Sequence, residues 1–297
     1  MISLKRILAM VCAVAMIGTL AACGGASSSA PASSAASSET ASSEAASSEA
    51  ASSEAASSET ASKGKLRVGT SADFPPYEFH QMDANGNDMI VGADIELAKY
   101  ICEQLGYELE IVDMSFDGLV GGLKEGSYDM IIAGFSITPE REAECLFSQP
   151  YFGMEQVVLV RAEDKDAYTS ADVLMGKKVA GQMGSLQESL ARQYAGETAV
   201  IIQNFQDSIM MLMEGQLDAV ICETTVGDSV LASNPALVKS DIQIEMDANN
   251  IAVAFNKDNT ELCEQVNEVL DTVIAEKMVD KWVMQFQEQA DTAEAAA

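Results

Sequence analysis

The stretch FDGLVGGLKEGSYDMIIAGFSITPERE, residues 116–142, holds the pattern that decides the fold class. Residues 116–127 predict a short helix despite their glycines, and residues 128–137 predict a buried strand because they are mostly apolar. Thr138 is a good N-cap, and Pro139 suits the first position of a second helix. A helix, a strand and a helix in this order are typical of an α/β unit, in which ligands bind beyond the carboxyl ends of the strands.

The same alternation continues on both sides of this stretch. Residues 65–74 predict a short strand that runs into a turn, residues 75–80 a second extended piece, and residues 107–114 a strand. Residues 83–89 predict a hairpin loop, and Asp94 caps a helix that ends at Gly106. Downstream we expect strands over residues 177–185, 199–205, 217–223 and 249–258, and helices over residues 186–195, 207–216, 260–277 and 279–290. Two successive α/β units predict parallel sheets with helices on both faces, in one large domain or two lobes.

Arg141 stands at the third position of the helix that follows Thr138, where a capping box would place Glu or Gln. A cation there adds positive charge to the positive end of the helix dipole, which is unfavourable unless an anion is near. A bound carboxylate would remove this conflict, since a guanidinium grips it through two parallel hydrogen bonds. The alternative is an ion pair on a solvated face with Glu140, Glu142 or Glu144.

The turn between the strand over residues 177–185 and the helix over residues 186–195 is a second candidate. Ser185 and Glu188 form an S-x-x-E capping box, and Gly184 lets the backbone approach a ligand closely. Free N–H groups at this helix start would hold an anion. A well-capped helix without a ligand is the alternative.

The first 63 residues are expected to lie outside the folded part. Lys5 and Arg6 precede a short apolar segment, and LAAC, residues 20–23, resembles a bacterial lipobox. We therefore expect a signal peptide over residues 1–22 and a lipid on Cys23; an ordinary secretory signal with a chance cysteine is the alternative. Ser, Ala and Glu then recur with a period of five, which predicts a disordered tether over residues 23–63.

The composition argues against several classes of function. A formal net charge of -29 argues against nucleic acid as a partner, because phosphate binding needs clustered Lys and Arg. His80 is the sole histidine and is predicted in a loop, which argues against His-dependent triads and zinc enzymes. We expect no metal and no other cofactor. The cysteines of the folded part lack C-x-x-C spacing and are predicted to be buried free thiols: Cys102, Cys145, Cys222 and Cys263.

From about Leu66 to Phe286, the chain resembles the polar amino-acid-binding proteins of ABC importers, the solute-binding protein family 3. The motifs LRVGTSADFPPYEF, GADIELAKYICEQLG, FSQPYF and LDAVICET follow in the family's order with the opening stretch. The resemblance implies a two-lobed, periplasmic-binding-protein-like type II α/β fold with a hinge of two crossover strands. It implies lobe 1 at residues 64–155 and 250–297 and lobe 2 at residues 156–249, which would close around a ligand.

The resemblance also implies the binding residues. Arg141 would grip the α-carboxylate of an L-amino acid, Glu223 would pair with the α-ammonium, and Phe74 and Phe116 would flank the ligand's side chain. The full expected set is Ser71, Phe74, Phe116, Ala133, Gly134, Ser136, Arg141, Gly184, Ser185, Leu186 and Glu223.

Several positions depart from the family pattern. Glu223 is one methylene longer than the usual Asp, and Leu186 replaces a Thr hydroxyl. Ser71 is neutral where relatives that bind basic amino acids carry an acid. A buried distal cation without a carboxylate is costly, so we expect a neutral polar ligand rather than a basic one. Asp73 would supply the missing carboxylate if the turn is rotated.

The implied function is capture of an L-amino acid outside the membrane and delivery to a permease and ATPase complex. We expect a monomer without enzymatic activity, held by its lipid at the extracytoplasmic face of the cell membrane. A tethered amino-acid sensor and a cyclohexadienyl-dehydratase-like enzyme on the same fold, with Glu223 as general acid, remain alternatives. Gene neighbourhood would separate the sensor from the transport protein, and turnover of prephenate or arogenate would reveal the enzyme.

Overall fold

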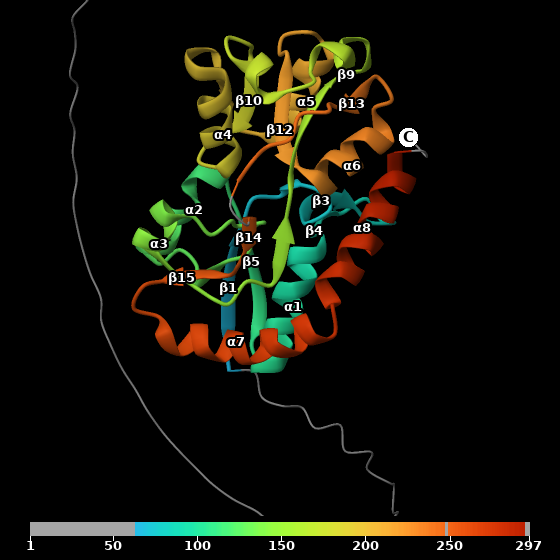
Figure 1. Ribbon diagram of the computed structural model, residues 1–297. Coiled ribbons are helices and arrows are strands. Elements are labelled where there is room, and N and C mark those ends of the chain that lie inside the picture. The colour runs from blue at the N-terminus through green and yellow to red at the C-terminus, as the bar shows by residue number, and fades with distance from the viewer. Residues whose placement is uncertain (1–62, 247–248, 295–297) are drawn as a thin grey trace, which may run out of the picture. The chain divides into compact units, whose positions relative to one another are not determined.

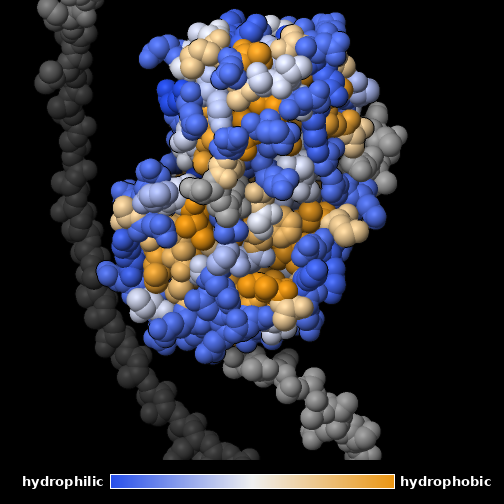
Figure 2. Space-filling model, viewed as in Figure 1, coloured by the Kyte–Doolittle hydropathy of each residue, from blue (hydrophilic) through white to orange (hydrophobic). Residues whose placement is uncertain are grey.

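The structure is a computed structural model that describes residues 63–246 and 249–294. The predicted signal peptide, the predicted lipid site Cys23 and the repeats of the predicted tether lie outside the described residues. Within the two described ranges, no helix combines the length and the apolar character that crossing a membrane requires. The face drawn in Figure 2 is mostly hydrophilic, as the acidic composition suggests.

The first sheet has the strand order β5-β1-β6-β15-β7. β1 is parallel to β5 and β6, whereas β15 is antiparallel to β6 and β7, because the chain returns to this sheet from the opposite direction after residue 249. Its strands are β1 (Lys65–Thr70), β5 (Glu108–Asp113), β6 (Met130–Ile131), β7 (Cys145–Phe147) and β15 (Ala254–Asn256). The sheet is therefore mixed: β1, β5 and β6 form the predicted parallel part, and β15 adds antiparallel pairs that the sequence did not predict.

Helices cover both faces of this sheet, as the sequence predicts. Met130 packs in the hydrophobic cluster that contains residues of α1 and α7, and its neighbour Ile131 packs in a second cluster with α2. This alternation is the two-residue period of a strand that is buried on both faces. The helices are α1 (Ala93–Leu105), α2 (Leu119–Glu125), α7 (Thr260–Ala275) and α8 (Met278–Glu294), with a 3₁₀ turn, η1 (Phe116–Gly118), before α2.

The second sheet has the order β11-β10-β12-β9-β13 and is mixed in the same way. β10 is parallel to β11 and β12, whereas β9 enters from the first sheet and is antiparallel to both of its neighbours. The strands are β9 (Gln156–Arg161), β10 (Val179–Gln182), β11 (Val200–Ile202), β12 (Ala219–Glu223) and β13 (Leu237–Lys239). The helices are α4 (Leu186–Ala195), α5 (Phe205–Met213) and α6 (Thr224–Ser233), with 3₁₀ turns η2 (Ala162–Ala167), η3 (Ala171–Leu174) and η4 (Gly196–Thr198).

Two extended segments connect the sheets. β8 (Phe152–Met154) leads into the second sheet, β14 (Asn249–Ile251) leads back, and the two pair antiparallel with Gly153 opposite Asn250. Figure 1 shows β14 between the two sheets. The sequence predicted one continuous strand over residues 249–258, but it is divided into β14 and β15, which belong to different sheets. The lobe boundaries at residues 155/156 and 249/250 stay a prediction.

A three-stranded hairpin sheet lies beside the first sheet's α1. β3 (Glu78–Met82) pairs antiparallel with β2 (Asp73–Phe74) and β4 (Asp88–Val91). The turn between β3 and β4 is the predicted one, and the Asp83 carboxylate accepts hydrogen bonds from the backbone N–H groups of Asn85 and Asn87. His80 lies in β3 rather than in a loop, and its ring bridges Asp88 and Asp113.

The ends of α1 confirm one prediction and correct another. Gly106 is the left-handed C-cap, as predicted. The N-cap is Gly92, not Asp94, and α1 has no side-chain cap. The reason is tertiary: the backbone carbonyl of Tyr77 already accepts a hydrogen bond from the backbone N–H of Asp94. The Asp94 side chain is therefore free to turn into the interior, where it is fully buried.

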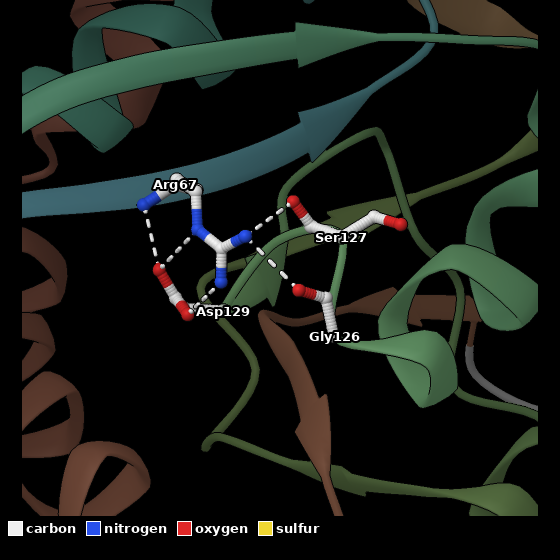
Figure 3. A network of polar contacts seen from close by, with 4 residues as sticks. All are labelled: Arg67, Gly126, Ser127 and Asp129. Carbon is white, nitrogen blue, oxygen red and sulfur yellow. Dashed lines mark hydrogen bonds and ion pairs between the residues drawn. The ribbon is translucent and has the colours of Figure 1, made fainter.

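Arg67 on β1 joins two parts of lobe 1 (Figure 3). Its guanidinium forms an ion pair with Asp129 at 2.8 Å and donates to the backbone carbonyls of Gly126 and Ser127 at 2.9 and 2.8 Å. These carbonyls follow the C-terminus of α2, where backbone acceptors lack partners within the helix. The predicted thiols Cys102, Cys145, Cys222 and Cys263 are buried and free.

Candidate functional site

A small cavity lies where the two lobes meet, and residues of both lobes and of the crossover form its walls. Its volume is about 10 Å³, roughly the room that one water molecule needs. The lining residues are Phe74, Phe116, Ala133, Gly134, Ser136, Arg141, Met154, Gln182, Ser185, Leu186 and Gln187. Eight of the eleven residues expected from sequence are among them. The lobes thus touch closely here, and a larger ligand requires them to separate.

Arg141 is the central cation of this cavity. It lies in α3 (Pro139–Glu144), which begins as predicted: Thr138 is the N-cap, and its hydroxyl accepts a hydrogen bond from the backbone N–H of Arg141. Only 9% of the residue is exposed. The guanidinium carbon lies 3.9 Å from the ring centre of Phe135 and 5.2 Å from that of Phe116. This packing fixes the plane of the guanidinium.

Arg141 has no carboxylate partner among the described residues. Its guanidinium donates to the backbone carbonyls of Ser136 at 2.8 Å and Gly184 at 3.0 Å, which leaves donors unused. The alternative of a surface pair is not found: Glu144 pairs with Lys124, and Arg141 itself is buried. Burial lowers the pKa of Arg141 to about 10, since desolvation disfavours its charge. A buried cation in this state favours an anion in the cavity.

The turn at Gly134 supplies a wall from lobe 1. Gly134 has a φ of 53°, in the left-handed region that other residues rarely adopt. Its backbone N–H donates to the Asp94 carboxylate at 2.6 Å, so α1 and the end of β6 are joined directly behind the cavity.

The turn at Gly184 and Ser185 supplies the wall from lobe 2. The Ser185 hydroxyl accepts from the backbone N–H of Glu188, and the Glu188 carboxylate accepts from that of Gly184, which confirms the predicted capping arrangement. A Cβ at Gly184 would lie 2.9 Å from the Cα of Asp117 in lobe 1. Gly184 does not line the cavity, but its carbonyl accepts from Arg141, so it joins the lobes at this point.

Asp73 precedes the lining residue Phe74 and bonds to the lining residue Gln182, but it does not itself line the cavity. Its carboxylate accepts hydrogen bonds from the side chain of Gln182 and the backbone N–H of Phe205, both at 2.8 Å and both from lobe 2. Its pKa is raised, mainly by burial and against the effect of these hydrogen bonds. In the part of the chain that the structure describes, no Lys, Arg or His forms an ion pair with Asp73.

Besides Gly184, the expected residues Ser71 and Glu223 are absent from the cavity wall. The Ser71 hydroxyl donates to Asp73 at 3.3 Å and therefore supports that carboxylate instead. Glu223 ends β12 and caps α6, accepting from the backbone N–H of Val226 at 3.0 Å. Glu223 is 2% exposed, burial raises its pKa, and it too lacks a cation among the described residues.

Sequence reasoning missed three lining residues: Met154, Gln182 and Gln187. The two glutamines flank the Gly184–Ser185 turn, so the prediction of a binding turn there could have been extended to them. Met154 belongs to the crossover, whose pairing with β14 no local pattern shows. Among the described residues, no group of three or more His, Cys, Asp or Glu side chains is arranged to hold a metal ion. The binding roles of the lining residues stay a prediction.

Comparison with known protein families decides the class of the protein. Residues 66–287 match the family model of the bacterial extracellular solute-binding proteins, family 3. The chain belongs to this family. It is 34% identical to the arginine-binding extracellular protein ArtP of Bacillus subtilis, over 74% of this chain and 86% of the relative. It is 31% identical to the ABC transporter arginine-binding protein 1 of Escherichia coli, over 74% of this chain and 91% of the relative.

The solved structures agree with this assignment. The amino acid ABC transporter substrate-binding protein AbpA of Streptococcus pneumoniae, bound to L-arginine, superimposes with a TM-score of 0.74 at 36% identity, covering 77% of this chain and 96% of AbpA. The predicted two-lobed type II fold is thereby confirmed. The family 3 protein described here is a substrate-binding protein of an amino-acid ABC importer.

Proposed function

We propose that this family 3 protein binds a basic L-amino acid, arginine in the first place, between its lobes and delivers it to the permease. The observation that carries the proposal is a set of three charged side chains that lack an ion-pair partner. Arg141 is a cation without a carboxylate, and Asp73 and Glu223 are carboxylates without a cation in the described residues. One cation and two anions complement a ligand with one carboxylate and two cationic groups.

Arg141 is the proposed partner of the ligand's α-carboxylate. Its guanidinium carbon lies 3.9 Å from the ring centre of Phe135, and the group donates to two backbone carbonyls, which are weaker acceptors than a carboxylate. The N-terminus of α4 lies on the same cavity through Ser185 and Leu186, and its dipole favours negative charge there. Both features act on the same end of an amino acid.

Asp73 is the proposed partner of the ligand's distal cation, and Glu223 that of its α-ammonium. Ionisation of Asp73 is opposed by burial, so a cation that approaches its carboxylate would stabilise the charged form. This proposal departs from the neutral ligand that Ser71 suggests, because the structure places the Asp73 carboxylate against Gln182 of the cavity wall. The relatives named as arginine-binding proteins support the same choice.

Hinge motion is the proposed route of entry. The cavity has room for about one water, and Asp73, Gly184 and Arg141 already make contacts from lobe to lobe. We infer that these contacts separate when the lobes open and that the ligand replaces them on closure. The relatives are transport proteins, and we propose that this chain likewise acts as a monomeric receptor that leaves its ligand chemically unchanged.

Competition calorimetry with arginine, lysine, histidine, glutamine and cystine tests the ligand. We expect arginine to bind tightest and to displace the others. Tighter binding of glutamine or cystine than of arginine and lysine would overturn the basic ligand while leaving the amino-acid site in place. The ligand recovered from the complex should be intact.

We also propose that Cys23 carries the lipid anchor and that residues 1–22 are removed. The support is the sequence LAAC at residues 20–23 after a short apolar segment. Cys23→Ala should release the protein from membranes or block its processing. A mature, lipid-labelled Cys23→Ala protein in the membrane fraction would overturn the lipobox assignment.

A further inference from the structure

Glu78 is an acid in an unusual position behind the proposed binding site. It lies on β3, is 1% exposed, and neither of its carboxylate oxygens accepts a hydrogen bond from any donor in the described part of the chain. An ionised carboxylate without donors or a cation is very costly in a protein interior. The side chain must therefore differ from an ordinary ionised glutamate.

The neighbour of Glu78 is Asp94, whose carboxyl group raises the pKa of Glu78 after burial has done so. The two segments meet where the backbone N–H of Asp94 donates to the carbonyl of Tyr77, the residue before Glu78. Asp94 is fully buried but well supplied with donors: the backbone N–H of Gly134 at 2.6 Å and the hydroxyl of Tyr151 at 2.9 Å. Two carboxyl groups in contact cannot both be ionised without strong repulsion. The donors stabilise the negative charge on Asp94, so the proton of the pair belongs on Glu78.

The surroundings of Glu78 reinforce this arrangement. The groups that act on it are Asp94 of α1, Asp73 of β2 and Asp113 of β5, all of them acids. The nearest histidine in sequence, His80, is already shared by Asp88 and Asp113. Burial raises the pKa of Glu78 well above its ordinary value, and these acids raise it further. Burial raises the pKa of Asp94 to about 6, against the effect of its donors.

We propose that Glu78 carries a proton in the folded protein at neutral pH and donates it to the Asp94 carboxylate, so that the acid pair holds the backbone N–H of Gly134 and positions one wall of the ligand cavity. Glu78 is thus a positioning residue that does not touch the ligand. Asp94 also accepts from Tyr151, whose backbone N–H donates to Ile251 of the returning crossover strand. The pair therefore joins the cavity wall to the hinge.

Comparing Glu78→Gln with Glu78→Met distinguishes the effect of the donated hydrogen bond from the effect of side-chain size. The amide of Gln donates to Asp94 as the neutral acid does, whereas Met has similar length and no donor. We expect Glu78→Gln to keep arginine affinity within about threefold, and Glu78→Met to lose about tenfold or more, the size of a lost hydrogen bond to a charged group. Equal affinities of the two variants would overturn the positioning role.

The pH dependence of unfolding tests the proton without any ligand. A buried acid with a raised pKa stabilises the fold below its unfolded pKa of about 4.3 and loses that contribution as pH rises towards its folded pKa. Relative to Glu78→Gln, the unfolding equilibrium constant of the wild type should therefore rise by up to about tenfold per pH unit from about pH 5 to neutral pH. Glu103→Gln, at an exposed position of α1, is the control and should give a difference that does not change with pH.

An infrared measurement keeps the proposal testable if a variant does not fold. The folded wild type at pH 7 should show the C=O band of a protonated carboxylic acid, and Glu78→Gln should lack it. Absence of this band, or a pH-independent stability difference from Glu78→Gln, would overturn the proposal. The affinity measurements rest on the proposed arginine site. If the wild type does not bind arginine, the proposed function fails. The unfolding and infrared measurements need no ligand and still decide whether Glu78 carries the proton.

Discussion

Arg67 and Arg141 lie in the same lobe, yet their electrostatic surroundings are opposite. Arg67 forms an ion pair with Asp129 and caps the end of α2, so its partners all come from its own lobe (Figure 3). Arg141 is more deeply buried and bonds to two backbone carbonyls, one of them from the other lobe. The difference teaches that Arg67 has its anion within the fold, whereas Arg141 has none among the described residues, which supports the proposal that Arg141 binds the ligand's carboxylate.

The other two arginines after residue 22 resemble Arg67. Arg161 pairs with Asp164 at 2.7 Å, and Arg192 pairs with Glu188 at 2.8 Å. Asp73 is the acidic counterpart of Arg141, because it bonds across the lobes to Gln182 and Phe205 rather than to a cation. We therefore propose that Arg67, Arg161 and Arg192 serve the structure and that Arg141 and Asp73 serve binding, and mutation can test that division.

Arg141→Ala should have the largest effect and should act on binding. Removing one partner of a buried, hydrogen-bonded charge pair costs about 2–5 kcal/mol, or roughly 30-fold to several thousand-fold in arginine affinity. Arg141→Lys should also bind poorly, because an ammonium cannot make the planar two-pronged contact. Isothermal titration calorimetry measures both, and near wild-type affinity for Arg141→Ala would remove Arg141 from the site.

Asp73→Asn should have the second-largest effect and lower arginine affinity roughly 10- to 100-fold. Glutamine affinity should change much less, because only the distal cation of arginine loses its partner. The same calorimetry measures it, with Asp258→Asn, at an exposed position after β15, as the charge-matched control. Equal losses for arginine and glutamine would mean that Asp73 only holds the lobes together.

Lowering the pH should reproduce part of the loss of arginine affinity that is expected for Asp73→Asn. The pKa of Asp73 is raised, so lowering the pH from 7 protonates it before an ordinary aspartate and weakens arginine binding, by at most about tenfold per pH unit for one linked proton. Glutamine affinity should be less affected. An arginine affinity that stays constant down to pH 4 would contradict this role of Asp73.

In contrast to the changes at Arg141 and Asp73, Arg67→Ala should lower the stability of the fold without changing arginine affinity. The hydrogen bonds with Asp129, Gly126 and Ser127 are half-buried or exposed, so we expect a loss of about 1–2 kcal/mol in the free energy of unfolding. Urea denaturation of the ligand-free protein measures it. A loss of arginine affinity comparable to that of Arg141→Ala would break the division between the two arginines.

Arg192→Ala should have the smallest effect. Its pair with Glu188 lies one helical turn away on an exposed face of α4, where such pairs contribute about 0.3–0.5 kcal/mol. Stability and arginine affinity should both stay close to the wild type. A large change in affinity would indicate that Glu188, which also accepts from Gly184, transmits strain to the cavity turn.

The amino-acid sequence by itself determined the features that depend on neighbouring residues. The cap at Thr138, the left-handed end at Gly106 and the bounds of α4 over residues 186–195 follow from side chains a few positions apart, and the structure confirms them. The unfavourable charge of Arg141 at a helix start was likewise a local conflict. It pointed to the cavity before any distance was known.

Only the tertiary structure decided what depends on chain segments far apart in the sequence. The sequence predicts Asp94 as a helix cap. In the structure, its backbone N–H donates to the carbonyl of Tyr77, and its carboxylate accepts a hydrogen bond from the backbone N–H of Gly134. Asp73 was a candidate for the distal cation from the sequence, but only the structure shows that its carboxylate meets Gln182, 109 residues away. The sheets are mixed because the chain crosses between the lobes twice, and burial of the Glu78–Asp94 pair follows from that packing. Hydrogen-bond partners and desolvation are set by three-dimensional neighbours, which local sequence patterns do not contain.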